Sequence, residues 1–266
     1  MGAKAIFPAR FAGYSATAAS QNGGQIVSWL TGCALALLAF PPAAAGQQLE
    51  TVGAGISGNV TQTWVTPKVI LMLPYVLATD EDLSRYDEVG YRLSVYARWR
   101  VGQSRFFVQP ELAYTQTRGQ DYLVLFDLSG PVGPGAVPFS HRIWRWEVVA
   151  LGGLRTGRRT YVLAGPVLAF NRRDALLEVP ATSPPYPPTA AIYNSLNQSV
   201  ERVQALGQVG VGFIAGRFDF NVRYEQSLTP YSRRFFFEGN VYAYRQQLRQ
   251  GIFTAGFLLY KQKSQP

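Results

Sequence analysis

His141 is the side chain best suited to catalysis in this chain of 266 residues, because it is the only histidine. A hydrolase or acyltransferase would use it as a general base beside a serine or a carboxylate. Ser140 is its neighbour, but adjacent residues of a strand point to opposite faces, which separates the two groups. We therefore interpret His141 as an ordinary residue at the edge of a loop and expect no enzymatic activity.

The sequence gives little support for a metal site or a nucleotide-binding site. Cys33 is the only cysteine, and it lies in an export segment described below, so only scattered carboxylates remain as metal ligands. The glycine-rich stretch Leu206 to Gly212 precedes no helical pattern and lacks the context of a nucleotide-binding loop. Small residues facing a crowded interior, or relieving strand curvature, account for it better. We expect no catalytic residues, no metal and no cofactor.

The charged residues follow a pattern of their own. Residues of both signs lie at alternate positions of strand-like segments, on one polar face: Arg92, Arg98, Glu111, Arg145, Glu147, Asp219, Arg223 and Glu225. We predict a structural charge network in which the glutamates are partnered by the arginines, formed by Arg92, Glu111, Arg145, Glu147, Arg223 and Glu225.

The elements that carry these charges read as β-strands, because the dominant hydrophobic period is two. Between Val89 and Arg100, apolar residues occupy the odd positions and mainly polar ones the even positions. Similar alternation predicts eight strands, at about 62–77, 88–101, 104–118, 140–154, 158–170, 205–216, 217–227 and 248–260. Each is long enough to cross a bilayer as a tilted strand.

The connections between these strands alternate between short and long. Tight turns are expected at Gly102-Gln103, Thr156-Gly157 and Gly216-Arg217, each with glycine at a positive φ. The longer connections span about 78–87, 119–139, 171–204 and 228–247. In an up-and-down chain all the short turns fall at one end, as in transmembrane barrels with short periplasmic turns. Lipid offers no hydrogen bonds to a free sheet edge, so the last strand must pair with the first.

The period alone does not say which face points outward. A soluble lipocalin-like carrier would turn its apolar face inward around a ligand. Aromatics near the strand ends, charges of both signs on the polar face and the lack of cysteine in the exported chain favour the opposite arrangement. With Arg, Tyr and Gln frequent on the inner face, we favour a filled lumen over a narrow polar pore, since eight strands enclose little space.

The N-terminal region resembles an export signal. Lys4 and Arg10 precede an apolar core at 26–40, and the A-x-A pattern of Ala43 and Ala45 places cleavage before Gly46. A membrane anchor is one alternative, and lipidation at Cys33 within the sequence Leu-Thr-Gly-Cys is another. We assign residues 1–45 to a signal peptide and 46–266 to the barrel domain.

The formal charge of +9 falls to +7 when Lys4 and Arg10 are removed with the signal. Arginines are scattered along the strands rather than gathered in a basic run, so no nucleic-acid partner is expected. Two loop segments are candidates for recognition. Residues 180–188 hold five prolines and suggest an extended polyproline-like segment, and 233–237 combine two arginines with three phenylalanines.

Two segments near the end carry a family resemblance. Val222-Arg223-Tyr224-Glu225-Gln226-Ser227-Leu228-Thr229 and the last strand, Gln250 to Tyr260, resemble the final two strands of the PorT-like outer-membrane β-barrel proteins of Gram-negative bacteria. Ser227 stands where many relatives have Gly, and the chain continues past Tyr260 to Pro266 without a terminal Phe. The resemblance implies an outer-membrane barrel without shared catalytic residues, and some members are associated with protein secretion.

These features together predict an all-β protein, an eight-stranded antiparallel up-and-down transmembrane barrel in the cell outer membrane. We expect a structural or interaction role that displays long extracellular loops, within an envelope or secretion assembly. A narrow passive channel for small solutes and a soluble lipocalin-like carrier are the alternatives. The expected partners are outer-membrane lipid and lipopolysaccharide, with other envelope proteins as a further class.

Overall fold

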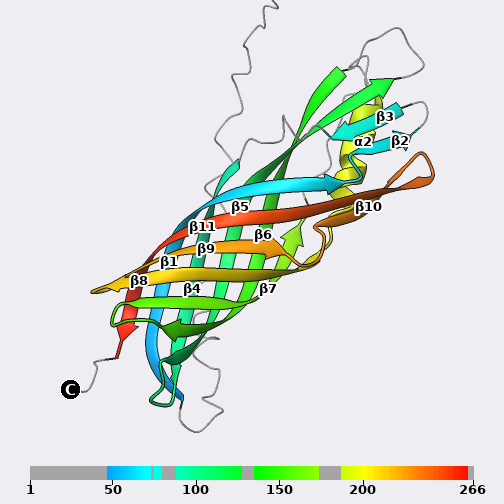
Figure 1. Ribbon diagram of the computed structural model, residues 1–266. Coiled ribbons are helices and arrows are strands. Elements are labelled where there is room, and N and C mark those ends of the chain that lie inside the picture. Colours follow the sequence, from blue (N-terminus) through cyan, green and yellow to red (C-terminus); the bar gives the residue numbers. More distant parts are fainter. Residues whose placement is uncertain (1–46, 73–74, 80–87, 128–134, 174–186, 263–266) are drawn as a thin grey trace, which may run out of the picture.

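The computed structural model describes residues 47–72, 75–79, 88–127, 135–173 and 187–262 (Figure 1). The predicted signal peptide at 1–45 and its cleavage site lie outside these residues. Within them, β-strands dominate, and α2 (Pro187–Gln198) is the α-helix of the described part. None of the helical residues described forms a segment long and apolar enough to cross a membrane.

Eight long strands form a closed antiparallel barrel. Each pairs with the next barrel strand along the chain, and the last pairs with the first from Thr51 opposite Lys261 to Thr66 opposite Arg245. The strands are β1 (Gln47–Thr66), β4 (Glu88–Val101), β5 (Phe106–Asp127), β6 (Gly135–Arg155), β7 (Thr160–Arg172), β8 (Val203–Ala215), β9 (Phe218–Ser227) and β11 (Asn240–Lys261). The predicted strand number, up-and-down order and closure are confirmed.

The predicted position of the first strand, 62–77, is wrong. β1 begins at Gln47 and stops at Thr66, directly before Pro67, whose missing N–H cannot continue the ladder. Much of β1 is made of Gly, Ala, Ser and Thr, so its alternation carries little hydrophobic contrast. The more apolar residues that follow form a separate hairpin, β2 (Val69–Met72) and β3 (Tyr75–Thr79), and β3 pairs with the far end of β5.

The short turns all lie at one end of the barrel, as predicted. Gly102 and Gly216 have positive φ, at 59° and 64°, which confirms two of the three expected left-handed glycines. The prediction is wrong for Gly157, whose φ is not positive. The third turn is instead held by the amides of Thr156 and Gly157, which both donate to the carbonyl of Thr160, at 3.1 and 3.3 Å.

The described parts of the long connections lie together at the opposite end of the barrel and form a cap. β5 and β6 continue beyond their predicted limits, and α2, the β2–β3 hairpin and β10 (Ser232–Phe237) gather beside them (Figure 1). Their buried apolar side chains form one cluster: Val65, Ile70, Met72, Leu77, Ile192, Leu196, Phe235, Phe237 and Tyr244. The cap therefore has a hydrophobic core of its own.

The helix α2 replaces part of the extended segment that the prolines suggested. Pro187 and Pro188 begin the helix, where a fixed φ and a missing N–H do no harm, so the polyproline expectation is wrong for these two residues. Pro180, Pro184 and Pro185 lie outside the described residues. On β10, the Phe236 amide donates to Ser195 Oγ at 3.0 Å, and the Ser195 hydroxyl donates to the Phe236 carbonyl. These two hydrogen bonds fasten α2 to β10.

The barrel wall is apolar outside and polar inside. Branched and aromatic side chains face outward along the strands: Ile56, Val89, Val148, Leu168, Val209, Val211, Phe218, Val222, Phe253 and Phe257. The alternate positions hold buried polar and charged side chains, together with an apolar cluster that includes Leu151, Leu163 and Leu206. A soluble carrier would show the reverse pattern, so the lipocalin-like alternative is not supported. An apolar outer band around a closed barrel with a polar interior is the arrangement of outer-membrane barrels.

Glycines on the inner face make room for large rings on neighbouring strands. A Cβ at Gly153 would overlap the ring of Phe107, and one at Gly212 would overlap the ring of Tyr161. Phe107 and Tyr161 in turn contact each other edge-on, with ring centroids 5.7 Å apart. Gly212 belongs to the glycine-rich stretch of β8, and it faces a crowded lumen as expected.

We predict that Gly153→Ala destabilises the barrel by about 1–3 kcal/mol, the usual cost of forcing extra volume into a packed interior. Urea unfolding in lipid vesicles, followed by tryptophan fluorescence, measures the change. Gly251→Ala is the matched control, because nothing lies within 4 Å of a Cβ at that position. Equal stability of the two variants would contradict the assigned contact.

Candidate functional site

Six charged residues meet in the middle of the lumen. Arg92 comes from β4, Glu111 from β5, Arg145 and Glu147 from β6, and Arg223 and Glu225 from β9. Each occupies an inward position of its strand, and each is at most 2% exposed. Strand alternation thus delivers side chains from four strands to one level of the barrel.

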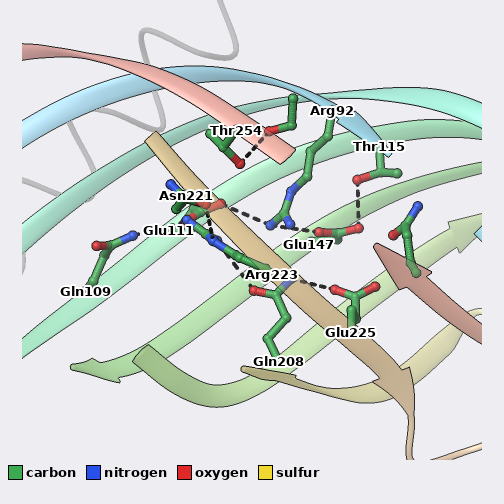
Figure 2. A network of polar contacts seen from close by, with 12 residues as sticks. Arg92, Gln109, Glu111, Thr115, Glu147, Gln208, Asn221, Arg223, Glu225 and Thr254 are labelled. Atoms are coloured by element: carbon green, nitrogen blue, oxygen red, sulfur yellow. Dashed lines mark hydrogen bonds and ion pairs between the residues drawn. The ribbon is translucent and has the colours of Figure 1, made fainter. Parts of the chain in front are cut away.

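These residues form a continuous chain of alternating charge, and Figure 2 labels five of them: Arg92, Glu111, Glu147, Arg223 and Glu225. Arg223 contacts Glu111 at 2.8 Å, and Glu111 contacts Arg92 at 3.0 Å. Arg92 lies 3.0 Å from Glu147, Glu147 lies 2.6 Å from Arg145, and Arg145 pairs with Glu225. The chain begins and ends on β9, so it runs around the lumen and links strands that are not neighbours in the sheet.

Neutral side chains add further hydrogen bonds to this network, although Arg92 Nε and Nη1 are buried without a hydrogen-bond partner. Thr115 donates to Glu147 at 2.7 Å, and Gln208 donates to Glu225 at 2.6 Å. Arg145 also donates to Gln250 at 2.8 Å, and Arg223 donates to Asn221 at 2.8 Å. The contact between Arg92 and Glu147 Oε2 is less well aligned, since that oxygen has no hydrogen-bond partner.

A second polar cluster lies nearer the short turns and centres on Asp219. Tyr161 and Tyr96 donate to its two carboxylate oxygens at 2.5 and 2.8 Å, and Arg98 pairs with it at 3.1 Å. Arg98 also donates to Gln109, and its guanidinium lies 4.6 and 4.4 Å from the ring centroids of Phe107 and Tyr161. The aromatic rings and the ion pair fill this section of the lumen.

The structure brings all six residues of the predicted network together, with every glutamate partnered by arginine. Arg98 and Asp219 share the polar face predicted from the sequence, but they were not predicted to belong to the network. Tyr161 was missed because a tyrosine at a strand start is equally suited to the lipid interface. Tyr161 occupies an odd position of β7, and the odd positions of that strand point inward. This alternation was the signal that could have identified it.

Charge is balanced in the two clusters. The four arginines, Arg92, Arg98, Arg145 and Arg223, face the four carboxylates of Glu111, Glu147, Asp219 and Glu225. All eight are almost fully buried. Side chains that line a water-filled pore would be exposed to it, so this part of the lumen is packed by side chains, as an eight-stranded barrel permits.

Two other candidates from the sequence lie away from this network. His141 is part of β6, with its backbone opposite Gly119, and the side chains of His141 and Ser140 lie outside what is described. In β10, Phe235 and Phe237 are buried in the cap. Phe236 is exposed, as are Arg233 and Arg234. Among the described residues, no group of His, Cys, Asp and Glu is arranged to hold a metal ion.

Comparisons with solved structures find barrels of similar fold, at low sequence identity and low TM-score. No family model matches the chain, and no curated protein matches it by sequence. Among solved structures, Neisserial surface protein A covers 78% of this chain and 97% of its own, at 9% identity and a TM-score of 0.39. Ail of Yersinia pestis covers 78% and 99%, at 12% identity and a TM-score of 0.36.

A third solved structure, the outer-membrane protein AlkL, covers 85% of this chain and 98% of its own, at 11% identity and a TM-score of 0.32. At this level of similarity the assignment of a small outer-membrane-type barrel rests on the strand pairing and the two faces of the wall described above.

We predict that Glu147→Gln destabilises the barrel by about 3–5 kcal/mol, because Arg92 and Arg145 would then share a buried site with too little negative charge. Urea unfolding of the folded barrel in vesicles measures the loss. Glu201→Gln makes the same change at an exposed ion pair with Arg233 and should alter stability by less than about 1 kcal/mol. A Glu147→Gln barrel as stable as wild type would show that the network contributes nothing to stability.

Proposed function

We propose that this chain is a structural barrel of the outer membrane that does not conduct solutes and that presents its folded cap to the cell exterior. The observation that carries this proposal is the balanced, buried charge network across the lumen. A solute path would need exposed polar walls, whereas these arginines and glutamates are buried and paired with one another. The cap adds a hydrophobic core above the same lumen.

The outer wall supports lipid as the partner of the strands. Arg249 lies 4.7 Å from the ring centroid of Trp64, and Arg172 lies 5.9 Å from that of Trp144. Cations beside interfacial aromatics, above an apolar band, suit the phosphate groups of lipid and lipopolysaccharide. In the proposed orientation these residues lie at the cap side of the band, where lipopolysaccharide is found.

The finer assignments rest on sequence motifs. Membership of the PorT-like family, and a part in a secretion or envelope assembly, follow from the resemblance of the last two strands. The cap is the surface that this proposal assigns to contacts with other envelope proteins, because it is folded, exposed and separate from the lipid-facing wall.

Planar-bilayer recordings test the proposal. We expect wild-type protein, inserted into membranes whose outer leaflet contains lipopolysaccharide, to give no stable conductance steps. The double variant Arg145→Ala/Glu147→Ala removes two neighbouring members of the ring and should open a small conductance. Arg233→Ala/Glu201→Ala is the matched control, since it deletes an exposed ion pair and should remain silent.

Steady conductance from the wild-type protein would contradict a filled lumen and favour the narrow channel. A silent double variant that is folded and inserted would show that the network is not what blocks the lumen.

A further inference from the structure

The end of the barrel opposite the cap holds a cavity whose charge is not balanced. Its volume is about 510 Å³, within the usual range for small-molecule sites. The cations that line it are Arg100, Arg155, Arg158, Arg159 and Lys261. Glu50 is the carboxylate of the lining, and it is paired with Arg155. Four cations thus remain without a carboxylate in the lining, in contrast to the balanced lumen above.

Of those four cations, two donate hydrogen bonds to neutral groups, and the other two have no ion-pair partner among the described residues. Arg100 donates to the amide oxygen of Gln48 at 2.8 Å, and Lys261 donates to the carbonyl of Gly216 at 3.1 Å. Arg158 and Arg159 are exposed in the β6–β7 turn and have no ion pair within the described part of the chain. Arg100 Nε and the hydroxyl of Thr51, which also lines the cavity, are buried without a hydrogen-bond partner.

Irregularities in two strands aim side chains into this cavity. Opposite β4, the register of β1 shifts between Leu49 and Thr51, so that Glu50 is a bulged residue. Opposite β11, the register of β1 shifts again between Val52 and Gly53, so that Leu259 has no partner on β1. The alternation of inward and outward side chains on β11 therefore changes before Lys261. Bulges at barrel rims commonly redirect side chains in this way. Without them, Glu50 and Lys261 would follow the outward-facing set of their strands.

We propose that this cavity binds a phosphate-bearing anion with at least two negative charges, entering from the periplasmic side. Guanidinium groups donate paired hydrogen bonds that match phosphate oxygens, and the unpartnered Arg100 Nε and Thr51 hydroxyl supply further donors. Four unmatched cations around one small cavity favour a compact ligand of high charge density. The source of the phosphate is either a soluble phosphate ester or the headgroup of an anionic phospholipid.

Calorimetric titration of the purified barrel with inorganic pyrophosphate, in an uncharged detergent at constant ionic strength, tests the site. We expect saturable binding of one pyrophosphate per chain. Arg158→Gln/Arg159→Gln should weaken it by at least about tenfold, the equivalent of losing one good charge-assisted contact. The variant residues are exposed turn positions, so the barrel should remain folded.

Arg105→Gln/Arg217→Gln is the matched control. Both residues are exposed in turns at the same end, but neither lines the cavity. The control removes the same charge and should keep the affinity within about twofold of wild type. No saturable binding, or an equal loss of affinity in the two double variants, would overturn the proposal, because the second result would reflect only the general positive potential.

A second arm distinguishes the sources. Phosphatidylglycerol added to the micelles should displace pyrophosphate if the site takes a lipid headgroup, and this displacement should be lost in Arg158→Gln/Arg159→Gln. Pyrophosphate binding that phosphatidylglycerol leaves unchanged would support a soluble phosphate ester as the ligand.

Discussion

The ring of alternating charge across the lumen is the interaction on which the rest of this structure depends. A closed barrel in lipid must satisfy its backbone through strand pairing and must put its polar side chains inside. Once arginine and glutamate are enclosed there, each needs a partner of opposite charge, because an unpaired buried ion is costly. The chain from Arg223 through Glu111, Arg92, Glu147 and Arg145 to Glu225 meets that requirement. It also ties together opposite walls that share no backbone hydrogen bonds.

The two ends of the barrel are built by different means. At one end, α2 and the β2–β3 and β10–β11 hairpins bury apolar side chains against each other. At the other end, tight turns leave an open cavity lined by cations. The two charged clusters of the lumen between them are balanced, in contrast to the cation-lined cavity at the turns. We propose contact with proteins at the cap and with anions at the turns.

Period-two alternation was sufficient to predict the barrel and the polar face. It worked for β4, β6 and β9 because large apolar residues alternate there with charged ones. It failed for β1, where Gly53, Gly55 and Ser57 alternate with Ala54 and Gly58, since small residues give little contrast. The cap was not predicted, because its core joins residues from five separate segments, and neither the hairpin after Pro67 nor the helix after Pro187 has a strong local signal. The bulge at Glu50 likewise depends on register between strands.

The central claim is that the apolar faces of these strands contact lipid while the charged faces close the lumen. Gel mobility of the protein from a washed outer-membrane fraction, with and without boiling, tests it most directly. A folded barrel resists cold detergent, so we predict that the protein stays in the membrane pellet and changes its mobility on heating. Protein that is soluble after the wash and shows no shift would contradict the account, because the apolar faces would then have to point inward.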